Sequence, residues 1–216
     1  FVDGRVPQYF LNSVIIVSFS VALTSFFAFT ISYACARMRW KRRRLIFNLV
    51  LLGMVIPIHT TLLPNFQWFK VFGLIDTRVG VIIAYVAFNL SFSTLMFSGL
   101  IASIPNSMEE SAYIDGAPMA RILASIIAPM AKAGFVTVSV MTFLNAWNEF
   151  IMANTYLATE SKRTLPFSII RFEGQYSADY AVQFAVMMLV AIPALIFFFI
   201  FSKYVIAGVT AGAVKE

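Results

Sequence analysis

The 216-residue sequence is poor in charge and nearly lacks cysteine and histidine. Charged side chains make up 12% of it, about half the share of a typical soluble domain, which excludes an ordinary water-soluble fold. The single cysteine, Cys35, excludes an internal disulfide and a cysteine-based zinc site, and its apolar surroundings indicate a packed small residue. His59 is the only histidine and has no cluster of carboxylates beside it in the sequence, so we expect no metal site.

Apolar residues dominate instead, at 60% of the chain, with 23 phenylalanines. A helix needs about 20 mainly apolar residues to cross the hydrocarbon core of a bilayer. Five stretches meet this requirement, so we predict an all-α membrane protein with five transmembrane helices and an exposed lead-in over residues 1–12. The predicted spans are residues 13–36, 45–64, 79–102, 133–158 and 181–202.

A basic cluster sets the predicted orientation. Six of the eight residues 37–44 are Arg or Lys, and the positive-inside rule places them in the cytoplasm with Phe1 outside. Segments 65–78 and 159–180 then lie outside, and 103–132 lies inside. Because five spans would leave the two ends on opposite sides, we expect a sixth helix before Phe1. The net charge of +6 sits beside apolar runs, which favours membrane orientation over nucleic-acid binding.

Polar residues inside the predicted spans are candidates for a transport pathway. Pro57 and Pro64 predict a kinked or unwound second span, and such breaks usually line a cavity. Glu149 is the one acidic residue in a predicted span, and it could instead be a helix-end charge. The asparagines could equally form hydrogen bonds between helices. The candidates are His59, Asn89, Asn145, Asn148 and Glu149.

Residues 105–133 interrupt the apolar pattern with a polar, then amphipathic, stretch. Three of the ten acidic residues lie in it: Glu109, Glu110 and Asp115. Ser107 precedes Glu110 by three residues, which is the spacing of a capping box. We therefore predict a short helix over residues 108–115.

The following residues predict a turn and a second helix. Gly116 can adopt the left-handed conformation that ends a helix, and Pro118 fits a first helical turn. We predict a second helix over residues 118–127 and a bend at Pro129 into the next span. An ordinary loop would explain the polarity but not these signals together.

Large side chains are expected at the tip of this unit. Tyr113 and Ile114 directly precede the predicted turn. A short rigid helix with an aromatic side chain and acidic flanks suits a groove on a cytoplasmic partner.

The run Glu110-Ser-Ala-Tyr-Ile-Asp-Gly-Ala117, with Ile126 and Pro129 downstream, closely resembles the EAA loop of ABC-importer permease subunits. It departs from that pattern at three positions: Ser111 stands for alanine, Ala128 for leucine, and Ala133 where a second proline is common. The Trp-Asn-Glu-Phe run at 147–150 and the Thr-Ala-Gly-Ala-Val-Lys ending resemble the carbohydrate branch, and most of all the second permease of maltose-type importers, although Glu216 stands where glycine is usual.

The resemblance implies a type I ABC-importer permease fold in which residues 1–216 form one transmembrane domain and 105–133 form a cytoplasmic coupling helix. The residues it implies in ATPase coupling are Glu109, Glu110, Ala112, Tyr113, Asp115, Gly116 and Ala117.

The same resemblance implies the setting. The chain would work in a bacterial or archaeal plasma membrane with a dimer of ATP-binding subunits, a second homologous permease, an extracytoplasmic solute-binding protein and membrane lipid, without nucleic acid. No Gly-Lys-Ser/Thr phosphate loop is found, so ATP and magnesium are expected in the ATPase, and the chain is expected to have no cofactor and no catalytic residues.

Three other interpretations remain open. The solute could be a small molecule other than a sugar. An ion-coupled secondary transporter or channel would use His59 and Glu149 for coupling, but leaves 105–133 unexplained. An intramembrane enzyme would need a nucleophile beside a base, and no such partners are evident in the sequence.

Overall fold

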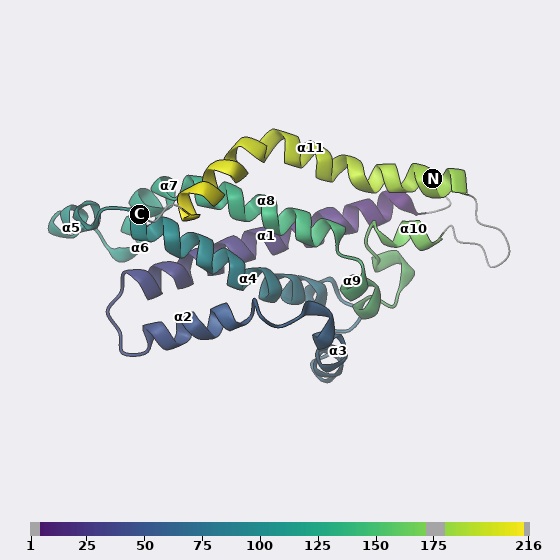
Figure 1. Ribbon diagram of the computed structural model, residues 1–216. Helices are drawn as coiled ribbons and strands as arrows, with labels where there is room; N and C mark the ends of the chain where they lie inside the picture. The colour runs from purple at the N-terminus through teal and green to yellow at the C-terminus, as the bar shows by residue number, and fades with distance from the viewer. Residues whose placement is uncertain (1–4, 172–179, 214–216) are drawn as a thin grey trace.

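The computed structural model describes residues 5–171 and 180–213, and this part of the chain is helical with no β-strand. Its long helices lie side by side in an elongated bundle, with α11 covering one side (Figure 1). They are α1 (Val6–Ala36), α4 (Arg78–Ser103), α8 (Lys132–Asn148) and α11 (Tyr180–Ala213). This confirms the all-helical prediction.

Short helices gather at the two ends of this bundle (Figure 1). At one end lie α5 (Asn106–Ile114), α6 (Met119–Ile122), the π-helical segment η2 (Leu123–Ile127) and α7 (Ala128–Met130). At the other lie α3 (Leu62–Val71), α9 (Ile151–Tyr156), the 3-10 segment η3 (Glu160–Lys162) and α10 (Phe167–Arg171). Between the ends, α2 (Arg43–Leu52) runs beside the bundle and leads to the 3-10 segment η1 (Ile58–Thr61).

Within the described residues, three helices are long and apolar enough to cross a membrane: α1, α4 and Gln183–Phe201 of α11. A fourth span exists if the helical pair Met119–Met130 and Lys132–Asn148, bent by 77°, counts as one. The structure is therefore that of a multi-span helical membrane protein. The number of five spans stays a prediction.

The stretch expected to form a second span, residues 45–64, is split. α2 ends at Leu52, and the chain is not helical again until η1 begins after Pro57. The predicted break is thus present. Pro64, however, lies in the first turn of α3, where a missing backbone N–H costs nothing. It belongs to the start of a helix that continues to Val71, so the segment 65–78 expected outside the spans begins with helical residues.

The stretch expected to form a fourth span, residues 133–158, is also interrupted. α8 ends at Asn148, the backbone of Glu149 is extended with ψ 126°, and α9 then begins at Ile151. The break leaves the first backbone N–H groups of α9 without partners in their own helix. A side chain must satisfy them.

α1 begins within residues 1–12, which were expected to form an exposed lead-in. The helix starts at Val6, with Pro7 in its first turn, and the side chains of Val6 and Tyr9 are buried. A proline at this position is pre-organised for a helix start. Residues 6–12 are thus part of the bundle, and that part of the prediction was wrong.

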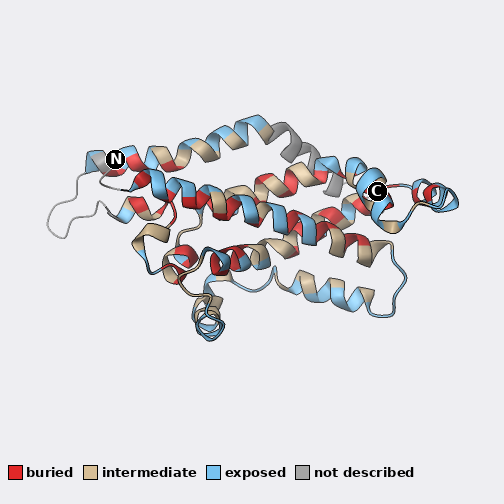
Figure 2. Ribbon diagram, turned by 180° about the vertical axis from the view of Figure 1, so that it is seen from behind, coloured by how far each residue is buried: buried red, intermediate tan, exposed pale blue. Residues whose placement is uncertain are grey.

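Small side chains let the central helices approach closely. Ser32 of α1 donates to the carbonyl of Thr94 in α4 at 2.8 Å, and both residues are buried. A Cβ atom on Gly134 of α8 would lie 2.4 Å from Cδ1 of Leu100 in α4. Buried residues follow the facing sides of these helices, whereas α2, α3 and much of α11 are exposed (Figure 2).

Candidate functional site

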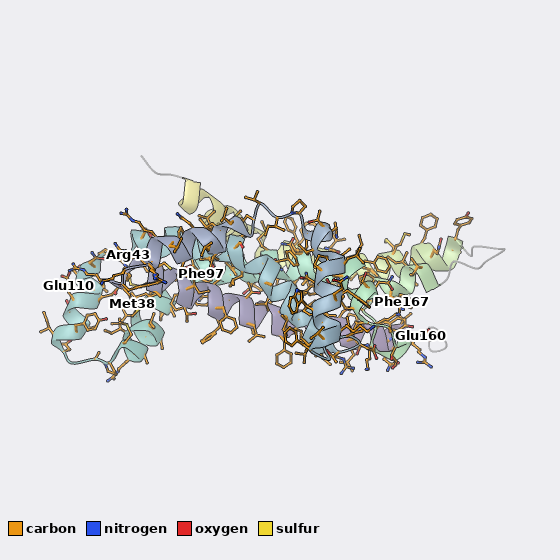
Figure 3. All side chains as sticks on the ribbon, turned by 90° about the horizontal axis from the view of Figure 1, so that it is seen from below. Met38, Arg43, Phe97, Glu110, Glu160 and Phe167 are labelled. Atoms are coloured by element: carbon orange, nitrogen blue, oxygen red, sulfur yellow. The ribbon has the colours of Figure 1, made fainter. Side chains whose placement is uncertain are left out.

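The stretch 105–133 and the basic residues 37–44 lie at the same end of the bundle. Met38 and Arg43 are near Glu110 in the side-chain view, while Glu160 and Phe167 are at the opposite end (Figure 3). The two segments thus share one side of the membrane if the bundle spans it, as the charge pattern requires.

α5 begins earlier than predicted, at Asn106, with Pro105 as its N-cap and no capping hydrogen bond from a side chain. Ser107 therefore lies inside the first turn, and the predicted capping box is wrong. The extended backbone of Pro105, with ψ 135°, starts the helix before the serine. The Ser107 carbonyl instead accepts a hydrogen bond from the Ser111 hydroxyl at 2.9 Å.

The turn after α5 has the predicted geometry. Gly116 is left-handed, with φ +74°. Its N–H donates to the Tyr113 carbonyl, and the N–H of Ala117 donates to the Ala112 carbonyl, both at 3.0 Å. These bonds satisfy carbonyls at the end of α5, as in other helices that end in a left-handed glycine.

The second helix differs from the prediction at both ends. Pro118 is its N-cap rather than its first helical residue, and the bend into α8 lies at Ala131 rather than Pro129. The π-helical segment η2 directly precedes α7 and widens the hydrogen-bond spacing there. This spacing accommodates Pro129, which has no N–H to donate.

The outward face of this unit carries most of the predicted coupling residues. Tyr113 is 48% exposed and Ile114, at the tip, is 86% exposed. Glu110, Asp115 and Gly116 are also exposed, whereas Ala112 is buried and Ala117 half-buried. The unit therefore exposes an aromatic, an apolar and two acidic side chains.

Glu109 points the other way and is only 7% exposed. Its Oε1 lies 3.1 Å from Nε of Arg37, and its Oε2 accepts a hydrogen bond from the Tyr33 hydroxyl at 2.8 Å. The structure thus places Glu109 against the end of α1. The sequence alone suggested no role for Tyr33 and did not single out Arg37. Their four-residue spacing, which places both on one helix face, is the signal that could have paired them.

Two of the candidate pathway residues meet. The Asn145 amide of α8 donates to Asn89 Oδ1 of α4 at 3.0 Å, and the Asn89 amide donates to the Tyr85 carbonyl at 2.8 Å. Asn148 is exposed and donates to the Leu144 carbonyl in its own helix. The Asn89–Asn145 pair therefore joins two helices.

Glu149 provides hydrogen-bond acceptors for backbone N–H groups at the start of α9. Its carboxylate accepts hydrogen bonds from the N–H groups of Met152 at 2.8 Å and Ala153 at 3.1 Å. It also accepts one from the Tyr85 hydroxyl of α4 at 2.8 Å. Tyr85 lies one turn before Asn89, a spacing that could have identified it.

His59 lies apart from this group, on η1, and its side chain is exposed. The structure describes no hydrogen bond from His59 to the Asn89–Asn145 pair or to Glu149. A mainly apolar pocket of about 330 Å³ lies between the interrupted segment and α4. Its lining includes Gly53, Thr61, Asn65, Phe69, Ala84 and Phe88.

The end opposite α5 is held by a polar cluster that sequence reasoning missed. Asp76, with φ +58°, accepts hydrogen bonds from the Thr159 N–H at 2.8 Å and hydroxyl at 2.6 Å, and its carboxylate lies 2.8 Å from Lys162 Nζ. Burial alone would raise the pKa of Asp76, but the bonds from Lys162 and Thr159 hold this pKa well below its usual range. The cluster fastens the segment after α9 to the segment before α4.

Comparisons with known proteins agree with this arrangement. The model of the family "binding-protein-dependent transport system inner membrane component" matches residues 20–211. The chain is 31% identical over 215 residues to the sulfoquinovosyl glycerol transport system permease protein SmoH of Agrobacterium fabrum, covering 100% of this chain and 75% of SmoH. It is also 31% identical over 215 residues to the diacetylchitobiose uptake system permease protein NgcG of Streptomyces coelicolor, covering 99% and 71%.

Solved structures show the same fold. A chain of a bacterial ABC transporter involved in the import of the acidic polysaccharide alginate matches with a TM-score of 0.78 and 23% identity, over 93% of this chain and 78% of that chain. A chain of the MetNI methionine ABC transporter matches with a TM-score of 0.63 and 19% identity, over 90% and 95%. The chain therefore belongs to the family of binding-protein-dependent transport system inner membrane components.

Proposed function

We propose that the chain is the permease subunit of an ATP-driven sugar importer and couples to a separate ATPase through residues 105–133. The observation that carries this proposal is the unit formed by α5, the Gly116 turn and α6. It projects from the bundle at the basic end and exposes Tyr113 and Ile114. An exposed rigid helix with apolar side chains is suited to a groove on a partner.

Membership of the family supports the following partners. The permease lies in a bacterial or archaeal plasma membrane, where a second, homologous permease completes the translocation pathway. A dimer of ATP-binding subunits binds ATP and magnesium and receives α5. An extracytoplasmic solute-binding protein delivers the solute to the end that carries α3 and α10.

A sugar is the favoured solute because several relatives are named for sugar transport. Besides SmoH and NgcG, they include the trehalose transport system permease protein SugB of Mycobacterium tuberculosis, 32% identical over 186 residues. They also include the arabinooligosaccharides transport system permease protein AraQ of Bacillus subtilis, 31% identical over 208 residues. Another small solute remains the alternative, since the family description names none.

Ion coupling is a weaker alternative. It would require an exchangeable acidic group, yet the Glu149 carboxylate already accepts three hydrogen bonds from Met152, Ala153 and Tyr85. His59 is exposed and apart from it. An ion-coupled transporter would also leave the projecting α5 unit without a role.

The test is ATP hydrolysis by the complete complex in proteoliposomes. The sugars named in the relatives' descriptions form the panel: trehalose, diacetylchitobiose, arabino-oligosaccharides and sulfoquinovosyl glycerol. We expect one of them, with the solute-binding protein, to raise the ATPase rate and to accumulate inside only when ATP is present. Uptake that persists with a catalytically inactive ATPase would contradict the proposal.

A further inference from the structure

α5 is attached to the bundle by a small part of its surface. Of its nine residues only Glu109 and Ala112 are buried. Ala112 contributes a methyl group to the apolar cluster beneath it, and Glu109 makes an ion pair and a hydrogen bond to α1. The covalent link to α4 is Ile104 and Pro105, both with extended backbone. Glu109 is therefore a buried polar attachment of α5 to α1.

Arg37 connects Glu109 to two spans at once. It is the C-cap of α1, and its guanidinium forms the ion pair with Glu109. The same guanidinium donates to the Ile101 carbonyl at 2.6 Å and to the Ile104 carbonyl, both at the end of α4. Carbonyls at a helix C-terminus carry the helix's negative partial charge, so a cation is favoured there. The ends of α1 and α4 and the helix α5 thus meet at the Arg37 guanidinium, which is rigid and planar.

Tyr33 extends this connection across the turn. Its hydroxyl donates to Glu109 and lies 3.4 Å from the sulfur of Met119, the first residue of α6. The Tyr113 hydroxyl lies 3.4 Å from the same sulfur. Both sides of the Gly116 turn are thus fastened to one turn of α1.

The contact between Arg37 and Glu109 is shielded from water. The side chains of Arg37 and Glu109 are 13% and 9% exposed, so separating them would leave charges in a poorly solvated place. Breaking such a pair is costly compared with breaking an exposed one. A displacement of α5 is therefore passed on rather than absorbed at this contact.

We propose that Tyr33, Arg37 and Glu109 are the positioning residues that transmit movement of α5 to α1 and α4. This inference rests on the proposed function, in which the ATPase moves α5. It also assigns Glu109 a role inside the permease, in place of the contact with the ATPase that its position in the coupling stretch predicts.

The test compares three variants of the complete complex in proteoliposomes, with the panel sugar that most raises the ATPase rate as the probe. Glu109→Gln keeps the shape but removes the charge, and Tyr33→Phe removes one hydroxyl. Arg44→Gln, an exposed member of the same basic segment, is the matched control. Three quantities are measured: co-purification of the ATPase, its hydrolysis rate, and sugar molecules transported per ATP.

We expect Glu109→Gln to retain the ATPase and its hydrolysis, while transport per ATP falls by at least about fivefold, the lower range of coupling between two sites. Tyr33→Phe should lower the ratio in the same direction but less, and Arg44→Gln should leave it unchanged.

Two results would overturn the inference: a wild-type ratio in both Glu109→Gln and Tyr33→Phe, or loss of the bound ATPase in Glu109→Gln, which would make Glu109 an ATPase contact. If Glu109→Gln does not fold, as judged by elution in detergent, Tyr33→Phe decides alone. Failure of the proposed function is distinguishable, because it appears in the unmodified complex as uptake without ATP or as no ATPase bound.

Discussion

Three carboxylates in this protein are each held by a specific set of donors. Glu109 pairs with Arg37, Glu149 accepts backbone N–H groups at the start of α9, and Asp76 is held by Lys162 and Thr159. Glu149 also accepts a hydrogen bond from the Tyr85 hydroxyl, so each carboxylate joins segments that are distant in the sequence. At the scale of single residues, the acidic side chains that point inward set the geometry, whereas Glu110 and Asp115 face outward.

The Asp76 cluster predicts a dependence of stability on pH. Because the folded-state pKa of Asp76 is held below the unfolded value of about 3.9, the carboxylate stabilises the fold fully above that pH and less as pH falls below it. We expect Asp76→Asn to cost about 1 kcal/mol at neutral pH, as for a partly exposed pair. Asparagine tolerates the positive φ, so added backbone strain is small.

Thermal unfolding in detergent across the acid range measures this effect. The difference between wild type and Asp76→Asn should shrink below about pH 4. Asp115→Asn, at the exposed tip of the α5 unit, is the control and should unfold like the wild type. A difference that grows on acidification would contradict the assignment.

Removing the carboxylate of Glu149 is expected to destabilise the fold more than Asp76→Asn does. Glu149→Leu leaves the N–H groups of Met152 and Ala153 and the Tyr85 hydroxyl without this acceptor, at a cost of about 1–3 kcal/mol per buried group left unsatisfied. Thermal unfolding should show it, while the control Asn148→Leu changes little. Normal stability combined with lost uptake would instead support a pathway role for Glu149.

At the scale of the helices, the breaks matter as much as the spans. The chain leaves regular helix before η1, at Glu149 and at Ala131. Pro57 pre-organises the start of η1 and the Glu149 carboxylate accepts N–H groups at the start of α9, whereas the break at Ala131 leads into the long helix α8. The break at Gly116 has a different consequence, because it shapes the unit proposed to meet the ATPase.

Substitution of Gly116 tests the shape of this unit. Gly116→Pro removes the N–H that donates to Tyr113 and imposes a φ of about −65°, which is incompatible with the observed +74°. We expect loss of ATPase co-purification and of transport, with the spans still inserted. Gly116→Asn should be tolerated, since asparagine visits the left-handed region.

Gly73→Pro is the matched control for this substitution. Gly73 is also left-handed, with φ +67°, but it follows α3 at the far end of the bundle. It should not release the ATPase. If Gly73→Pro and Gly116→Pro release the ATPase equally, general misfolding explains both.

At the scale of the whole molecule, the two ends of the bundle have different chemistry. One end carries the basic segment and the acidic α5 unit, and the other carries α3 (Figure 1), with Trp68 stacked on Phe72, and the Asp76 cluster. Between them the outward faces of α1 and α11 are apolar, with Phe19, Phe26 and Phe199 exposed. This distribution suits a membrane and a second permease around the spans.

The orientation can be measured by cysteine labelling in a Cys35→Ser background. A membrane-impermeant maleimide should label Trp68→Cys in intact cells, since Trp68 is 60% exposed on α3. Arg39→Cys, exposed in the basic segment, should react only after the cells are permeabilised. The reverse pattern would invert the proposed topology.

The sequence by itself determined the class and the family. Long apolar runs require helices, since backbone groups have no other partner in lipid. The Asp-Gly pair at 115–116 predicted the left-handed turn because few residues tolerate a positive φ. The motif around Glu110 was specific enough to identify the family, because these local signals do not depend on distant contacts.

Only the tertiary structure decided where the polar side chains point. Glu109 and Glu110 are neighbours with the same chemistry, yet one is buried against Arg37 and the other is exposed. Glu149 serves a helix start that exists only because the chain breaks after α8. These roles depend on partners up to 76 residues away in the sequence, and burial of a charge is decided by those partners rather than by local pattern.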